Sequence, residues 1–186
     1  MPLHDVGVAV KRVMAALQRR PEIGIHVDAP ALARWESGTR VVTRSTNGME
    51  VATDMPRELG GTGEQVTPGW LFRAGVASCA ATSITIAAVS AGIKLTALEV
   101  QVGSRSDARG LLGMSEPNEK PVYAGPFDVE LHVTVAANGS TPDALKILVE
   151  RCLSHSPVPC ALLTATPFKL HVNVTSVISV ASVAPE

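Results

Sequence analysis

The longest apolar stretch of the chain, residues 67–92, reads TPGWLFRAGVASCAATSITIAAVSAG and carries one charged side chain, Arg73. Thr67 suits the N-cap of a helix and Pro68 its first turn, whereas Gly92 suits the left-handed position after a helix end. A helix that is apolar on every face is either buried in a core or inserted in a membrane. Because small residues dominate this stretch, we predict a central core helix and expect no membrane span.

Other stretches alternate between apolar and polar positions, which is typical of half-buried strands. They are residues 98–102, 127–135 and 168–174. A β-hairpin is predicted around Asn47-Gly48, which stands between the short strand-like runs 39–45 and 49–53, because Asn-Gly favours a two-residue turn.

Helical spacing of apolar residues and helix-capping residues predict three further helices. They cover residues 4–20, 141–152 and 160–166. Pro21, Pro30 and Gly38 interrupt residues 21–38, which we expect to be irregular. Helices and strands follow one another without an internal repeat, so the fold class predicted is α+β.

The length of 186 residues suggests one domain with a proper core. We expect an N-terminal peripheral helix as an extension over residues 1–24 and the main domain over residues 25–186. The formal net charge is −1 and aromatic residues are few. No basic surface interleaved with aromatic side chains is predicted, which argues against nucleic acid as a partner.

Three cysteines without a secretory signal favour free thiols in a reducing compartment, so we expect a cytoplasmic protein. Cys152 falls on the apolar stripe of its helix and is predicted to be a core residue. No second pair with metal-ligand spacing accompanies Cys152, His155 and Cys160, so no metal site is expected. The glycines of residues 60–63 lack the order of a phosphate-binding loop, and we expect no cofactor.

Cys79 is the best candidate for chemistry, because a thiolate is a strong nucleophile and this residue lies in the middle of the predicted central helix. The helix dipole fades within the first turn and does not reach Cys79, so activation requires a nearby cation. Arg73 precedes it by six residues, about 240° round the helix, and is poorly placed. Arg40, Arg44 and Arg57 are the other options, and the residue pattern leaves all three open.

A series of short motifs resembles the OsmC/Ohr family (osmotically inducible protein C and organic hydroperoxide resistance protein). In chain order they are Pro56-Arg57-Glu58-Leu59-Gly60-Gly61, Thr67-Pro68 with Leu71-Phe72, Ala77-Ser78-Cys79, Gly92-Ile93, Leu98-Glu99-Val100, Asp107 with Arg109-Gly110, and Ser156-Pro157-Val158. The resemblance spans residues 35–176. It implies an OsmC-like fold in which antiparallel sheets wrap long central buried helices, completed in an intertwined homodimer.

Active members of this family are thiol peroxidases. The resemblance implies that Cys79 attacks a peroxide and becomes a sulfenic acid, that a second cysteine then forms a disulfide, and that a dithiol reduces it. It also implies an activating Arg, to which Arg40 is the nearest match, and a Glu after the loop proline. This sequence departs from the family at two positions, since Gly69 replaces the Glu and Ser156 replaces the second cysteine. Cys160, four residues later, is a candidate for a displaced resolving thiol.

Two hypotheses follow. The first is a thiol-dependent hydroperoxide reductase acting in oxidative stress defence, with Cys79, Cys160 and Arg40 as its site residues. The alternative is a homodimer of the same fold that binds a small apolar ligand and is not a peroxidase, in which Cys79 is a small buried residue. An Arg guanidinium within about 4 Å of the Cys79 sulfur would favour the first hypothesis.

Overall fold

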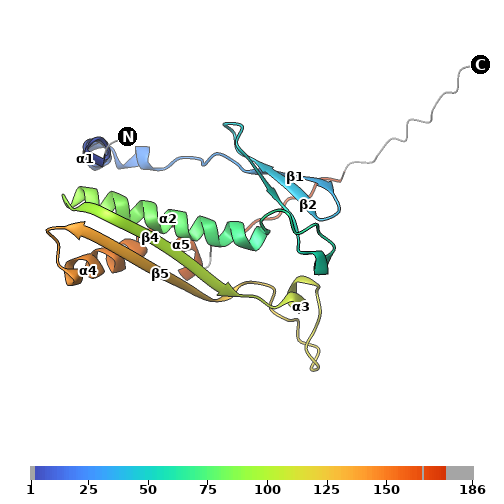
Figure 1. Ribbon diagram of the computed structural model, residues 1–186. Coiled ribbons are helices and arrows are strands. Elements are labelled where there is room, and N and C mark those ends of the chain that lie inside the picture. Colours follow the sequence, from blue (N-terminus) through green and yellow to red (C-terminus); the bar gives the residue numbers. More distant parts are fainter. Residues whose placement is uncertain (1–2, 165, 175–186) are drawn as a thin grey trace, which may run out of the picture.

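The computed structural model describes residues 3–164 and 166–174. Its described part is an α+β arrangement in which a long helix lies along a two-stranded sheet, with a three-stranded sheet at one end (Figure 1). The elements in chain order are α1 (Leu3–Arg19), the 3₁₀ helix η1 (Pro21–Gly24), β1 (Leu32–Ser37), β2 (Arg40–Arg44), β3 (Glu50–Thr53), the 3₁₀ helix η2 (Arg57–Leu59), α2 (Pro68–Ser90), β4 (Lys94–Arg105), α3 (Ala108–Leu111), β5 (Phe127–Asn138), α4 (Pro142–Leu153) and α5 (Pro157–Leu163).

The predicted central helix is α2. The Thr67 hydroxyl caps it by accepting a hydrogen bond from the backbone N–H of Trp70 at 3.1 Å, and Gly92 follows its end with a φ of 73°. Its fully buried residues lie one turn apart and are Val76, Ala80, Ile84 and Ala88. Helix α2 is long and apolar enough to cross a membrane, a criterion that core helices of soluble proteins also meet. In this structure it packs against α1, β4, α4 and α5.

Strands β4 and β5 form a long antiparallel pair that includes both predicted strands, 98–102 and 127–135, and extends beyond them. Val100 lies opposite Val133, so these two side chains point to the same face of the sheet. On that face α2 covers β4, and α4 lies over β5. The sheet thereby holds α2 and α4 side by side, which sets the position of everything that α2 carries.

Strands β1, β2 and β3 form a separate antiparallel sheet. The predicted hairpin at Asn47-Gly48 joins β2 to β3, and Gly48 has the positive φ of 86° that such a turn requires. The expectation of irregular chain over residues 21–38 is wrong for β1, because every residue of this strand is exposed and no apolar alternation marks it. This sheet makes at most marginal contact with the other described helices and strands, and Figure 1 shows it beyond the N-terminal end of α2.

Two predictions for the C-terminal region are wrong. The short helix begins at Pro157 rather than at residue 160, because a proline is compatible with the first helical position. The segment 168–174 forms no strand, and its Phe168 and Val174 are 88% and 90% exposed. A strand needs a ladder partner, and no strand of the described chain pairs with this segment.

Helix α1 confirms the helix predicted over residues 4–20 and packs on α2. The two helices approach closely, since a Cβ atom at Gly7 would lie 2.8 Å from Cγ1 of Val89. The division of the chain into an extension over residues 1–24 and a main domain stays a prediction.

Candidate functional site

The sulfur of Cys79 lies between α2 and the first turn of α5. It accepts a hydrogen bond from the Ser156 hydroxyl at 3.3 Å and a second from the backbone N–H of Val158 at 3.4 Å. Cys79 is half-buried, whereas Ser156 is 0% exposed. Two donors are therefore fixed on one sulfur atom, in the arrangement that would stabilise negative charge there.

The sequence Ser156-Pro157-Val158-Pro159 explains this geometry. Ser156 is the N-cap of α5, but its hydroxyl makes no capping hydrogen bond and is available to Cys79. The first N–H groups of a helix have no acceptor within the helix, and both prolines lack an N–H altogether. The N–H of Val158 is thus the donor that this turn presents to the sulfur of Cys79.

The other two cysteines, Cys152 on α4 and Cys160 on α5, make no hydrogen bond to Cys79. Cys160 donates its S–H to the backbone carbonyl of Ser154 at 3.1 Å, so its thiol points to the junction of α4 and α5. Cys152 is buried on α4, which confirms its predicted place in the core, and burial raises the pKa of its thiol. The resolving role of Cys160 stays a prediction.

None of the candidate arginines contacts Cys79 within the described chain. Arg40 lies on β2, and its Nε donates to the Glu36 carboxylate at 2.7 Å. Arg44 and Arg57 likewise donate to groups other than Cys79. The activating role of Arg40 stays a prediction, and the donors that the sulfur has in one chain are electrically neutral.

A buried carboxylate, Asp54, organises the loop that leads into α2. It is 2% exposed and accepts hydrogen bonds from the Thr39 hydroxyl at 2.5 Å, the Met55 N–H at 2.8 Å, and the N–H and hydroxyl of Thr62 at 2.8 and 2.7 Å. These bonds, that of Thr39 first, hold the pKa of the carboxyl well below its usual range. Gly61 passes so close that a Cβ would lie 1.8 Å from the Met55 carbonyl oxygen. Sequence reasoning missed this cluster, because nothing in the pattern distinguishes Asp54 from an exposed loop residue.

A groove of about 640 Å³ lies between α2 and α4, beginning one helical turn beyond Cys79. Its lining is mostly apolar and includes Ser83, Ile86, Leu148, Cys152, His155 and Pro157. A groove of this size and character fits a small apolar molecule or a packed side-chain surface. The described residues contain no group of three or more His, Cys, Asp or Glu placed to hold a metal ion.

Comparisons with solved structures support the same fold. The chain is similar to an OsmC-like protein from Mycoplasma pneumoniae, at 16% identity and a TM-score of 0.62 over 81% of this chain and 98% of that one. An organic hydroperoxide resistance protein from Elizabethkingia anophelis aligns at 24% identity and a TM-score of 0.56, over 74% and 89% of the two chains. A putative osmotic stress induced and detoxification response protein from Psychrobacter arcticus aligns at 20% and 0.55, over 74% and 90%. At these identities the likeness establishes the fold alone. No curated protein matches the chain.

The family comparison covers the elements that carry Cys79 and Ser156. Residues 61–171 match the family model described as OsmC-like protein. The matched region is more than half of the chain and contains α2 with Cys79, the sheet of β4 and β5, and the α4–α5 junction with Ser156. The chain therefore belongs to the OsmC-like protein family and has its α+β fold of antiparallel sheets and a long helix.

Proposed function

We propose that this protein is a thiol-dependent hydroperoxide reductase that acts in oxidative stress defence through Cys79. The observation that carries the proposal is the pair of hydrogen bonds from Ser156 and Val158 to the Cys79 sulfur. Donors fixed on a sulfur atom stabilise the thiolate, which is the form that attacks a peroxide. The name of the similar Elizabethkingia anophelis protein, an organic hydroperoxide resistance protein, agrees with this chemistry.

In the proposed first step the Cys79 thiolate attacks the terminal oxygen of a hydroperoxide ROOH. The S–O bond forms as the O–O bond breaks, the sulfur loses two electrons, and the alkoxide leaves as ROH after taking one proton. The product is Cys79 sulfenic acid. The Ser156 hydroxyl stays within reach of the oxidised sulfur but cannot form a disulfide with it.

The sulfenic acid must then be reduced by a thiol. A thiol sulfur attacks the Cys79 sulfur, the sulfenic oxygen leaves as water, and a disulfide forms. If Cys160 supplies this thiol, it has to leave the Ser154 carbonyl to which it is bonded. If an external thiol supplies it, a second external thiol releases Cys79, and the enzyme works with one cysteine.

A homodimer is part of the proposal. The sheet of β1, β2 and β3 makes at most marginal contact with the other described helices and strands, and Trp35 on it is 71% exposed, although a small sheet needs a packed face to be stable. Gly69, at the position of the family Glu, and Cys79 lie ten residues apart on one helix, a rise of about 15 Å. A group at position 69 therefore cannot reach the Cys79 sulfur of its own chain.

The test is peroxidase turnover by the full-length protein with cumene hydroperoxide and either dithiothreitol or glutathione, followed by mass mapping of the cysteines. The wild type should consume peroxide, and the Cys79→Ser variant should not. Cys152→Ala is the matched control, because this buried thiol makes no hydrogen bond to Cys79, and it should retain activity. Light scattering of the same samples tests the homodimer.

Each result of the mapping assigns one mechanism. A Cys79–Cys160 disulfide identifies Cys160 as the resolving thiol. Sulfenic acid or a mixed disulfide at Cys79 identifies a one-cysteine enzyme. Cys79 that remains a free thiol after excess peroxide contradicts the proposal.

A second function, a homodimer that binds a small apolar ligand, is favoured by two observations. The Cys79 sulfur has no guanidinium partner within the described chain, and the apolar groove between α2 and α4 begins one helical turn beyond it. If Cys79 proves unreactive, saturable binding of a neutral apolar probe in this groove would support this second function.

A further inference from the structure

A second pocket, which shares no lining residue with the groove between α2 and α4, lies where three segments meet. The loop around η2, the N-terminal end of α2 and the segment that contains α3 enclose about 520 Å³. The larger part of its wall is apolar and includes Met55, Leu59, Pro68, Phe72, Leu111 and Pro126. Its size and lining are those of a site for a small organic molecule.

Arg73 lines this pocket and carries a charge that the described chain does not neutralise. It is half-buried, its one hydrogen bond to a described residue runs from Nη1 to the Ser104 hydroxyl at 3.4 Å, and no ion pair joins it to a described carboxylate. Its guanidinium folds back along α2 over Gly69, where a Cβ would lie 3.6 Å from Nη1. A guanidinium has five N–H donors, so most of them remain available to a bound molecule.

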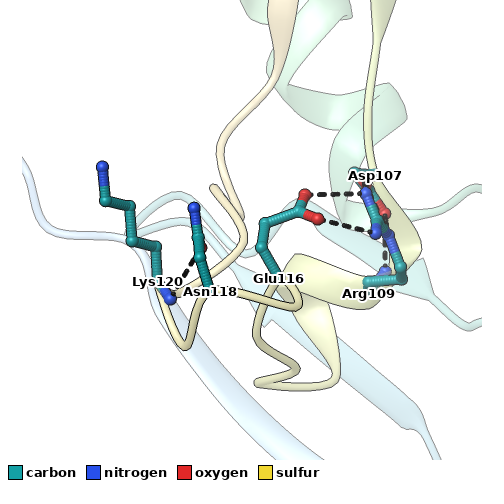
Figure 2. A network of polar contacts seen from close by, with 5 residues as sticks. All are labelled: Asp107, Arg109, Glu116, Asn118 and Lys120. Atoms are coloured by element: carbon teal, nitrogen blue, oxygen red, sulfur yellow. Dashed lines mark hydrogen bonds and ion pairs between the residues drawn. The ribbon is translucent and has the colours of Figure 1, made fainter.

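Among the described residues, Asp107 is the one carboxylate that lines the same pocket, and it is already paired. Figure 2 shows that the Arg109 side chain turns back onto it, with an Nη2–Oδ2 distance of 2.6 Å, while the Arg109 backbone N–H donates at 2.9 Å. Arg109 reaches Glu116 as well, at 3.1 Å. The hydrogen bonds from the Arg109 side chain and backbone hold the pKa of Asp107 below its ordinary value. Asp107 is therefore ionised but occupied, and it does not serve as the counter-ion of Arg73.

We propose that this pocket binds an amphipathic anion, a free alkyl or aryl carboxylate, with the carboxylate on Arg73 and the apolar body against Phe72, Leu59 and Leu111. A guanidinium and a carboxylate form two parallel hydrogen bonds, which gives the head group its orientation. The positive end of the α2 dipole, at Pro68 and Gly69, favours the same charge. This binding requires no reaction at Cys79, so it is independent of the proposed reductase.

The test compares decanoate with decanol by titration calorimetry of the full-length protein, with no peroxide present and below the concentration at which decanoate forms micelles. The two probes share an apolar chain and differ in the head group. Decanoate should bind roughly 10- to 100-fold more tightly, because hydrogen bonds to charged groups contribute that much. Arg73→Gln should remove this advantage and leave decanol binding unchanged, and Arg73→Lys should restore part of it.

Two control variants separate the effect of the Arg73 charge from the effect of the apolar contacts in the pocket. Arg105→Gln removes an arginine that pairs with Asp128 outside the pocket, and should bind decanoate as the wild type does. Leu111→Ser removes an apolar contact and should weaken both probes alike. Circular dichroism spectra and melting temperatures verify that each variant is folded.

Three results would overturn the proposal. Equal affinities of the wild type for decanoate and decanol, or undiminished decanoate binding by folded Arg73→Gln, would exclude Arg73 as the head-group site. If the wild type does not bind decanoate and Arg73→Gln changes the oligomeric state, Arg73 belongs to a contact between two copies of the chain.

Discussion

Replacing Ser156 with cysteine should turn its hydrogen bond to Cys79 into a covalent bond. The Ser156 oxygen lies 3.3 Å from the Cys79 sulfur, and a disulfide bond is about 2.05 Å long, so a sulfur at position 156 needs to move by only about 1 Å. Ser156→Cys would restore the family's second cysteine at the position to which the sequence motif assigns it. We expect oxidation of Cys79 by one equivalent of hydroperoxide to end in a disulfide between residues 79 and 156.

The size of the stability effect follows from the loop that this bond closes. The two residues are 77 positions apart, for which the chain-entropy estimate is a stabilisation of about 4.5 kcal/mol. At about 2.1 cal/mol/K of unfolding entropy per residue, a chain of 186 residues would gain up to about 11 °C in Tm. Engineered disulfides commonly deliver less, so a rise of several degrees is expected in the oxidised variant and none after reduction.

The assay is non-reducing peptide mapping after peroxide treatment, combined with Tm measured with and without dithiothreitol. Ser156→Ala is the matched control, because it cannot cross-link. Since it also removes one hydrogen-bond donor from the Cys79 sulfur, it should slow oxidation of Cys79 by about tenfold or more. Oxidised Cys79 in the Ser156→Cys variant without a bond to residue 156 would refute the placement of Ser156 beside the sulfur.

Two further predictions concern the loop that leads into α2. Asp54→Asn should lower the Tm at neutral pH, because the amide NH2 group replaces an acceptor that faces backbone donors. Since folding depresses the pKa of Asp54 below 3.8, its contribution to stability is present above that pH and is lost as the pH falls. Scans of Tm against pH should therefore converge in acid for the wild type and the variant, and parallel curves would contradict this. Thr67→Ala should cost about 1 kcal/mol, a fall in Tm of roughly 2–4 °C, by removing the hydroxyl that caps α2, whereas Thr67→Ser should retain most of the stability in the same scan.

The sequence was most informative where local rules decide the structure. The bounds of α2 follow from Thr67, Pro68 and Gly92, each of which has the conformation that its residue type favours. The prediction was wrong for β1 and for residues 168–174, because pairing decides whether a segment is a strand. Strand β1 pairs with β2 without any apolar alternation, whereas residues 168–174 alternate without a described partner.

The candidate site was predictable in its residue types but not in its contacts. The family motifs identify Cys79 and Ser156, yet the hydrogen bond between them depends on how the junction of α4 and α5 meets α2, over a separation of 77 residues. The angle between Arg73 and Cys79 on one helix argues against a contact between these two residues. The position of Arg73 in an apolar pocket became visible only with the loops around η2 and α3 in place.

The Asp54 cluster has a consequence for how two chains could associate. Besides its side-chain bonds, the N–H of Asp54 donates to the Val66 carbonyl at 3.1 Å, and a parallel bridge joins Thr53 to Val66. The passage from β3 to α2 is thus tied down at both of its ends, and the three-stranded sheet is not attached through a free linker. A second chain that docks on this sheet meets a surface whose orientation is already fixed, so little conformational entropy remains to be lost when the two chains associate.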